Sequence, residues 1–317
     1  MLRDLLAAGS TAALDSDGHR LLLRTDSTRS PDGTARTGDT DQLAEWEDGR
    51  VRPLTTGPDR VVTARYRPRH RQAVVEGDVG GDERSGLWLL DLAGDGPVDR
   101  AAMRPLTADP GAVHHLAGVS RDGRRVAVLS NRRDGVAFDL WVTDLDGGGE
   151  RLLAAPGGWC RPASGFSPDD RWVSVLRPGP GASDDELLLV DVATGEVREL
   201  LAHPGDPSVV GPPAWVDART LVVSTDVGRD RQALVRVDLD SGRSAVVVQR
   251  PWDVAGWTSP DGSLLLAVSN AAGTSHAELF DSRTLAPKGV LPLPDPDAVI
   301  AVSHLLPDPV DGPSGTP

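Results

Sequence analysis

Short apolar runs alternate with turn-forming residues along almost the whole chain. In the stretch 118–153, the run 126–129 (VAVL) follows the turn Ser120-Arg-Asp-Gly123, and the run 139–144 (DLWVTD) follows a polar loop. A Gly-rich turn then leads to a third run at 151–153. Runs of this length, rich in β-branched or aromatic residues and bounded by Asp and Gly, are typical of antiparallel strands joined by hairpins. Helical periodicity is nowhere sustained.

The same unit recurs about every 44 to 53 residues, and an internal repeat of this length is typical of stacked β-blades. Turns of the Ser-x-Asp-Gly type or degraded forms of it lie at 16–18, 67–70, 120–123, 167–170, 215–218, 259–262 and 309–312. An Asp closes the strand after each polar loop at positions 91, 144, 191, 238 and 281. Asp caps such a turn, and Gly, which follows several of these residues, adopts the positive φ that a short hairpin needs.

Four short strands in each repeat predict an all-β fold, a β-propeller of four-stranded antiparallel blades. We expect one propeller domain over 1–317, with six complete blades and the start of a seventh. The blades are expected at 10–57, 58–108, 109–155, 156–203, 204–250 and 251–295. The last stretch, 296–317, is either a partial seventh blade or a linker. The chain is then either a fragment of a longer protein or a six-bladed propeller with a tail. Small residues suit the crowded innermost strands; they are Ala64, Ala117, Ala163, Ala214, Ala255 and Gly256.

Charge and composition exclude several classes of protein. The chain has 33 Lys and Arg against 47 Asp and Glu, a net charge of −14, so it lacks the basic face that binds nucleic-acid phosphates. Cys160 is the single cysteine, so an internal disulfide cannot form. No run approaches the roughly 18 apolar residues of a membrane helix, and Asp4 interrupts the first apolar patch where a signal peptide would be uniformly apolar. We therefore expect a cytoplasmic protein that does not enter a membrane.

The repeat motifs resemble those of a known family. They are Ser120–Gly123 with Asp139–Asp144, Ser167–Asp169 with Leu187–Asp191, and Ser259–Gly262. With the Asp-x-x-Thr/Ser-Gly hairpins, these motifs resemble TolB-like propeller repeats. Within that set they are most similar to the N-terminal propeller of prolyl-oligopeptidase-family serine peptidases, of the acylaminoacyl-peptidase type. The resemblance implies a lid that covers an α/β-hydrolase domain and restricts access to short peptides.

The serine chemistry of that family cannot be transferred to this chain. No Gly-x-Ser-x-Gly nucleophile elbow is present. The nearest strings, at 118–122, 165–169 and 181–185, all have Asp where the second Gly belongs. We therefore assign no catalytic residue, and whether the intact gene product is a hydrolase stays open.

Candidate binding residues lie on or beside the innermost strands. Arg65, Tyr66, His115, Trp159, Arg161 and Trp257 are expected to line the central channel or one mouth of the propeller. Trp and Arg are common at protein interfaces, and Arg can bind a carboxylate through two hydrogen bonds. An alternative for Trp159 and Trp257 is packing between blades. Trp88 and Trp141 occupy one repeat position and are expected to be structural.

We expect no metal site and no cofactor. His114 and His115 are adjacent on a predicted strand and so point to opposite faces, which prevents them from binding one metal ion together. The acidic clusters at 39–41, 184–186 and 295–297 lack the spacing of a calcium loop.

Three functions compete. The first is a non-catalytic propeller that gates access to, or recruits, an α/β-hydrolase domain in cis or in trans, with short peptides as ligands. The second is a stand-alone TolB-like scaffold that binds another protein. The third is a propeller enzyme such as a calcium-dependent lactonase, which would need a carboxylate and Asn cluster that the predicted innermost strands do not offer.

Overall fold

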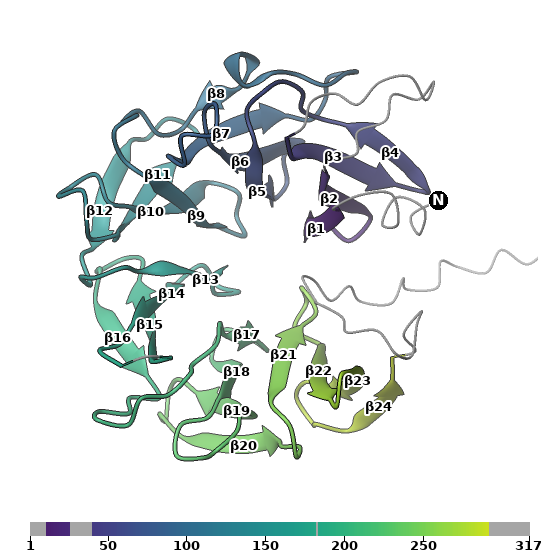
Figure 1. Cartoon of the computed structure of the whole chain (residues 1–317), viewed down its shortest axis with the longest axis vertical. Helices are drawn as coiled ribbons and strands as arrows, with labels where there is room; N and C mark the ends of the chain where they lie inside the picture. Colours follow the sequence, from purple (N-terminus) through teal and green to yellow (C-terminus); the bar gives the residue numbers. More distant parts are fainter. Residues whose placement is uncertain (1–10, 26–39, 182, 292–317) are drawn as a thin grey trace, which may run out of the picture.

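The chain folds into six antiparallel sheets arranged as a ring (Figure 1). This structure is a computed structural model, and it describes residues 11–25, 40–181 and 183–291. Each sheet has four strands in sequence order, so each is one blade. The predicted all-β propeller with six four-stranded blades is therefore confirmed. The expected start of a seventh blade, at 296–317, lies outside the described residues.

The strands have the following bounds, blade by blade. Blade 1 contains β1 (Thr11–Ser16), β2 (Arg20–Thr25), β3 (Gln42–Glu47) and β4 (Arg50–Pro53), and blade 2 contains β5 (Val61–Arg67), β6 (Gln72–Gly77), β7 (Gly86–Asp91) and β8 (Arg104–Pro105). Blade 3 contains β9 (His114–Val119), β10 (Arg125–Ser130), β11 (Asp139–Asp144) and β12 (Glu150–Ala154), and blade 4 contains β13 (Arg161–Phe166), β14 (Trp172–Pro178), β15 (Asp185–Asp191) and β16 (Val197–Leu200). Blade 5 contains β17 (Ala214–Trp215), β18 (Thr220–Thr225), β19 (Ala233–Asp238) and β20 (Ser244–Val248), and blade 6 contains β21 (Val254–Thr258), β22 (Leu264–Ala271), β23 (Thr274–Asp281) and β24 (Pro287–Val290). A short 3₁₀ turn, η1 (Arg100–Ala102), precedes β8.

The first strand of each blade lies toward the centre of the ring and the fourth lies at the rim (Figure 1). Because the strands run antiparallel, successive turns fall at opposite ends of the propeller. We call the end that carries the first-to-second and third-to-fourth turns the turn face. The opposite end carries the second-to-third hairpins and the connections between blades, and we call it the loop face.

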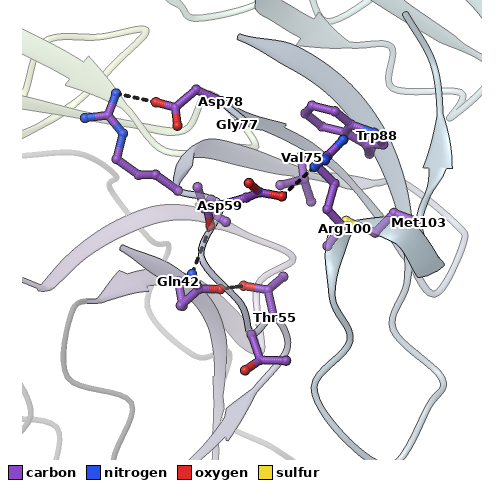
Figure 2. Close-up of a pocket in the computed structure, with 12 residues that line it drawn as sticks. Gln42, Thr55, Asp59, Val75, Gly77, Asp78, Trp88, Arg100 and Met103 are labelled. Carbon is purple, nitrogen blue, oxygen red and sulfur yellow. Dashed lines mark hydrogen bonds and ion pairs between the residues drawn. The ribbon is translucent and has the colours of Figure 1, made fainter. Parts of the chain in front are cut away.

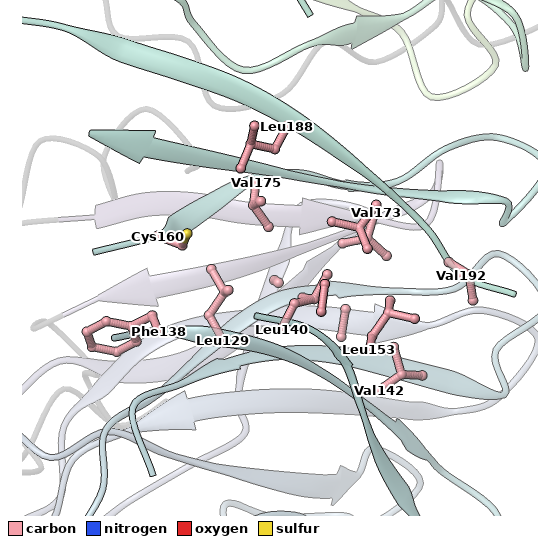
Figure 3. Close-up of a cluster of buried hydrophobic side chains, with 14 of the residues drawn as sticks. Leu129, Phe138, Leu140, Val142, Leu153, Cys160, Val173, Val175, Leu188 and Val192 are labelled. Carbon is pink, nitrogen blue, oxygen red and sulfur yellow. The ribbon is translucent and has the colours of Figure 1, made fainter. Parts of the chain in front are cut away.

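Apolar side chains from successive blades form the core. Five buried clusters join neighbouring blades, from the first to the sixth. Figure 3 shows the cluster between blades 3 and 4, which includes Leu129, Leu140, Val173 and Val175, all 1% exposed or less. Strands in this position are buried on both faces, which is why the sequence shows unbroken apolar runs rather than strict alternation.

The Ser-x-Asp-Gly turns are capped by their own side chains. In blade 4, the Ser167 hydroxyl donates to Asp169 at 2.6 Å and accepts from the Trp172 amide at 2.9 Å. The turns that begin at Ser120 and Ser259 repeat both hydrogen bonds. These three serines are 2% exposed or less, so the motif serves the turn. The two Gly-x-Ser-x-Asp strings that contain Ser120 and Ser167 are therefore parts of this turn.

Two glycines let the innermost strands of blades 3 and 4 approach each other. A Cβ on Gly118 would lie 2.8 Å from the Gly165 Cα, and one on Gly165 would lie 3.0 Å from the Ala117 oxygen. Gly165 also has a φ of +77°, which disfavours any other residue. The close approach lies near the turn-face ends of β9 and β13, so it packs the two innermost strands together at the end opposite the site described next.

Arginine side chains tie each blade to the next. Arg104 donates to the Leu145 carbonyl at 2.6 Å, and Arg198 donates to the Leu239 carbonyl at 2.7 Å. Arg52 and Arg151 make the same contact with Leu92 and Val192. In each case, the acceptor directly follows the Asp that closes the third strand of the next blade.

Blade 5 makes a corresponding tie from the neighbouring strand. There, Arg236 lies on β19, where it pairs with Ala245, and donates to the Arg283 carbonyl at 2.8 Å. Lys288 is the single lysine among the 33 lysine and arginine residues of the sequence. The ties between blades give a physical reason for arginine at five positions, because a planar guanidinium on a long stem reaches a backbone carbonyl while keeping further donors free.

Candidate partner-binding site

Exposed large apolar side chains have an uneven distribution over the described residues. Four lie on the loop face: Val79, Val136, Trp159 and Trp252. The others lie on the outermost strands or just after β24: Leu152, Val197, Val246, Val290 and Leu291. Among the described residues, none lies on the turn face. An exposed apolar group on one face of a propeller is a candidate for protein contact.

Trp159 is the centre of this group. It lies in the connection from blade 3 to blade 4 and is 68% exposed. Its ring forms a T-shaped pair with the Phe138 ring, with centroids 5.9 Å apart, and Phe138 stacks on His115 at a centroid distance of 5.2 Å. We call Trp159, Phe138 and His115 the aromatic cluster. Phe138 is 6% exposed, so a buried ring supports an exposed one, which is the arrangement of an interface anchor.

The aromatic cluster rests on the core between blades 3 and 4. Phe138 and Cys160 lie at one end of that core (Figure 3). The Phe138 amide donates to the Gly158 carbonyl at 3.0 Å, which holds the hairpin after β10 against the connection that carries Trp159. Burial raises the pKa of the Cys160 thiol to about 11, so this cysteine is an apolar packing group at neutral pH.

A buried carboxylate orients His115. Glu76 on β6 is 3% exposed and accepts from the Leu116 amide at 2.7 Å. Its other oxygen lies 2.9 Å from Nδ1 of His115. An ionised carboxylate accepts only, so the proton of a neutral His115 ring belongs on Nδ1. Nε2 then carries a lone pair, and with 35% of the side chain exposed it can accept a hydrogen bond from a partner.

Arginine–carboxylate pairs surround the aromatic cluster. Arg161 pairs with Asp185 at 2.8 Å and is 45% exposed. Arg133 pairs with Asp139, which is fully buried. Each guanidinium still has donors that face solvent, so the edge of the site can bind carbonyl or carboxylate oxygens of a partner.

The structure brings together three of the residues that the sequence singled out and separates the other three. His115, Trp159 and Arg161 lie at the adjoining loop-face ends of blades 3 and 4. Arg65 donates to the Ala64 carbonyl at 2.9 Å and also to the Leu14 carbonyl, in the junction of blades 1 and 2. Trp257 is half-buried and packs on Leu266 and Val268.

Tyr66 is buried in the same junction as Arg65. It is 7% exposed, and its hydroxyl donates to Glu45 at 3.0 Å. Burial and the negative charge of Glu45 raise the pKa of Tyr66 well above its usual range. The ring therefore packs in the core between blades 1 and 2 and does not line the central channel. Alternate residues of a strand face opposite sides, and Tyr66 lies on the side of β5 that faces this core.

The adjacent histidines have separate environments. His114 is 1% exposed, and Nε2 lies 3.1 Å from the Asp109 carbonyl. Burial lowers the pKa of His114, which keeps the ring neutral. His115 faces Glu76 instead. Over residues 11–25, 40–181 and 183–291, no group of three His, Cys, Asp or Glu side chains is arranged to hold a metal ion.

A hollow on the loop face lies between blades 1 and 2, apart from the aromatic cluster (Figure 2). It encloses about 310 Å³ including its open mouth, and its interior has room for about one water molecule. Asp78 pairs with Arg60 at 2.9 Å, and Asp59 pairs with Arg100 at 2.6 Å, so the charges balance. The interior is too small for a peptide side chain.

Trp88 and Trp141 have structural roles. Trp88 packs at the junction of blades 1 and 2 and also lines this hollow, with Arg100 5.3 Å from its ring. Trp141 packs at the junction of blades 2 and 3, with Arg132 3.5 Å from its ring.

The turn face differs from the loop face. Arg121, in the turn of blade 3, donates across the ring to the Pro260 carbonyl in the turn of blade 6, at 2.7 Å. Asp170 of blade 4 accepts from the Arg121 and Asp122 amides at 2.7 and 3.0 Å. These contacts connect three blades at the turn face and narrow that end.

Sequence reasoning missed Phe138, Val136, Trp252 and Glu76. Phe138 lies directly before Asp139, the first residue of β11, and the sequence pattern assigns this position to a polar loop. Glu76 follows an apolar run and gives no sign that it reaches the next blade. Trp252 follows Pro251, and its position in a connection between blades was the available signal.

No protein-family model matches the chain, and no curated protein matches it in sequence. Solved structures do match. A Mycobacterium tuberculosis puromycin-hydrolyzing peptidase aligns with a TM-score of 0.66 and 17% identity, covering 92% of this chain and 48% of the peptidase. A prolyl endopeptidase aligns with a TM-score of 0.66 and 16% identity, covering 92% of this chain and 43% of that protein. TolB from Acinetobacter baumannii aligns with a TM-score of 0.54 and 14% identity, covering 84% of this chain and 62% of TolB.

The chain thus spans about half the length of the two peptidases. Among its described residues, no helix is both long and apolar enough to span a membrane. The resemblance inferred from the repeat motifs is confirmed at the level of structure: this chain has a propeller similar in fold to those of puromycin-hydrolyzing and prolyl peptidases and of TolB.

Proposed function

We propose that this chain is a non-catalytic β-propeller whose loop face contacts an α/β-hydrolase domain, in cis or in trans, and gates the access of short peptides. The observation that carries the proposal is Trp159, which is 68% exposed although a buried aromatic base supports it. An exposed Trp on a supported base is typical of a partner's contact point. The chain's coverage of about half of each similar peptidase is consistent with a further domain.

We further propose that the protein acts in the cytoplasm. Its single cysteine is buried, so its stability does not depend on an oxidising compartment. The second candidate function, a stand-alone TolB-like scaffold, uses the same face for another protein. It is supported by the similarity to TolB, which covers 84% of this chain.

The mass of the native gene product in its source cells gives the first test. A product of about twice the 33.4 kDa of this chain supports a hydrolase in cis. A product near 33.4 kDa requires a partner in trans.

Photo-crosslinking then tests the loop face directly. The native product carries benzoylphenylalanine at position 159 or, as a matched exposed control on the outermost strand β12, at position 152. We expect crosslinking mainly from position 159, mapped by mass spectrometry to a hydrolase domain, because only position 159 lies at the proposed contact whereas position 152 lies on the rim strand β12. Crosslinks that map to a different protein would favour the stand-alone scaffold over the lid of a hydrolase domain. Equal yields at the two positions would refute both.

A further inference from the structure

A histidine and an aspartate are buried together beside the partner-binding site. Nε2 of His203 lies 3.0 Å from Oδ1 of Asp184, with the side chains 5% and 7% exposed. His203 lies in the connection from blade 4 to blade 5, and Asp184 directly precedes β15. Both segments belong to the loop face. We call this pair the clasp.

The surrounding backbone is shaped around the clasp. Asp184 also accepts from the Ser208 amide at 3.2 Å and from the Gly181 amide at 3.3 Å. A Cβ on Gly179 would lie 2.2 Å from a carboxylate oxygen of Asp184, so only glycine leaves room for it. The carboxylate thus connects the hairpin after β14 to the connection that follows β16.

Both ring nitrogens of His203 face acceptors. Nε2 faces the Asp184 carboxylate, and Nδ1 lies 2.8 Å from the Leu201 carbonyl. A neutral imidazole has one N–H and one lone pair, so it can satisfy only one of these oxygens. The protonated ring donates to both. Loss of the proton therefore sets a lone pair against an oxygen inside a buried contact, which favours opening of the clasp.

The charges around His203 favour the protonated ring. Burial lowers its pKa, but the hydrogen bonds to Leu201 and Asp184 and the negative charges of Asp184 and Glu199 outweigh burial, and the net pKa is raised above 6.5. The pKa of Asp184 is lowered, first by its hydrogen bond with His203. The contribution of the clasp is therefore complete below about pH 6.5 and is lost as pH rises through the raised pKa of His203.

A continuous set of contacts leads from the clasp to the connection that carries Trp159. Asp185, the residue after Asp184, donates its amide to the Ser208 carbonyl at 2.9 Å and pairs with Arg161 at 2.8 Å. One residue further, Glu186 pairs with Arg177. Arg177 donates to the Pro156 carbonyl at 2.7 Å, three residues before Trp159.

We propose that the His203–Asp184 clasp is a proton-controlled device that holds the Trp159 connection in place. The partner-binding site is rigid while His203 is protonated and loosens when His203 is neutral. This inference rests on the proposed function only for the role of the site, because the clasp itself needs no partner.

Hydrogen–deuterium exchange of the full chain, read by mass spectrometry and corrected for the intrinsic effect of pH, tests the clasp. Peptides covering 156–161, 183–187 and 203–210 are compared at about pH 6 and about pH 8, on either side of the titration of a histidine with a raised pKa. We expect about tenfold faster exchange at the higher pH in all three, since losing one buried hydrogen bond of about 1.4 kcal/mol corresponds to a factor of ten. In His203→Gln, which cannot titrate at this position, the ratio of the corrected exchange rate at about pH 8 to that at about pH 6 should fall to about one.

His276→Gln is the matched control, because His276 is exposed on β23 in another blade and should leave the ratio unchanged. If His203→Gln does not fold, NMR of the imidazole nitrogens in the wild-type chain takes its place as the test. The proposal then requires both ring nitrogens of His203 to be protonated at about pH 6.5. A ratio that persists in His203→Gln would overturn the proposal. A response confined to 203–210 would also overturn it, because the coupling to Trp159 would be missing. Pairing these results with the crosslinking separates a failed clasp from a failed partner site.

Discussion

Single residues explain why the repeat motif exists. The serine of each Ser-x-Asp-Gly turn caps the turn from a buried position, and its aspartate lies beside it. A buried hydroxyl that both donates and accepts contributes to turn stability, and its loss would leave a backbone amide unsatisfied. Two of these serines, Ser120 and Ser167, occur in strings that resemble a nucleophile elbow in sequence. Their burial shows that similarity in sequence does not place a hydroxyl where a substrate could reach it.

Glu45 gives a prediction at the residue scale. It is 2% exposed and accepts from Arg52 at 2.9 Å, from Arg71 at 2.5 Å and from Tyr66 at 3.0 Å. Burial raises its pKa, but these hydrogen bonds and the charge of Arg71 outweigh burial and lower the pKa to about 2. Because the pKa is depressed by folding, the stabilisation is present above the unfolded value of 4.5 and is lost as pH falls toward 2.

We therefore expect the free energy of unfolding to fall by about 2 kcal/mol more in the wild-type chain than in Glu45→Gln between about pH 5 and about pH 3. Urea denaturation at each pH measures the difference. Glu196→Gln, which changes an exposed glutamate in a turn of blade 4, should keep the wild-type slope. Parallel pH profiles for the wild type and Glu45→Gln would show that Glu45 is not the titrating group.

At the scale of the element, the blade is a repeated unit that reaches forward to the next one. An arginine near the start of the outermost strand binds the carbonyl after the closing Asp of the following blade. Blade 5 makes its tie from Arg236 on the neighbouring strand. The fold thus keeps a guanidinium contact between neighbouring blades, although in blade 5 both the strand that carries the arginine and the acceptor carbonyl differ.

Arg198 tests these ties. We expect Arg198→Ala to lower the free energy of unfolding by about 1 to 2 kcal/mol, because the charge-assisted hydrogen bond to the Leu239 carbonyl is partly buried. Arg198→Lys should recover only part of the loss, since an ammonium lacks the planar fork. Arg219→Ala is the matched control: Arg219 is 74% exposed and pairs with an aspartate that is also largely exposed, so its removal should cost less than about 0.5 kcal/mol. Equal effects of the two alanine substitutions in urea denaturation would argue against the role of the ties.

At the scale of the whole molecule, the two ends of the propeller have different characters. The turn face is narrowed by the contact between Arg121 and Pro260 across the ring. The loop face carries the aromatic cluster, the clasp and the hollow between blades 1 and 2. Exposed apolar side chains therefore lie at one end and mainly polar turns at the other, and under the proposed function a second domain would approach the loop face.

Removing the contact across the ring should loosen the turn face. In Arg121→Ala, we expect amide exchange in the blade 6 turn, 259–263, to rise about 3- to 10-fold, the range that one hydrogen bond of about 0.6 to 1.4 kcal/mol corresponds to. Arg124→Ala removes an exposed arginine of the same blade 3 turn and should have no such effect. Unchanged exchange in Arg121→Ala would mean that the contact is not maintained in solution.

The candidate site could be predicted only in part. Trp159, His115 and Arg161 were selected as Trp, His and Arg near the start of innermost strands, where the topology places the mouth of a propeller. Tyr66 met the same criterion, yet it is buried against Glu45. Its orientation depends on which face of β5 meets blade 1, and a repeat pattern without a sharp alternation of apolar and polar residues does not specify that face. Phe138 and Glu76 act through contacts between blades, which no local pattern encodes.

The sequence by itself determined the architecture, because a blade is a local unit. Each turn and each strand is specified within about fifty residues, and the unit repeats. Only the tertiary structure decided which arginines reach a neighbouring carbonyl, which rings lie on the loop face, and that His203 meets Asp184. The physical reason is that these contacts join residues from different blades or connections, so they exist only once the blades are stacked.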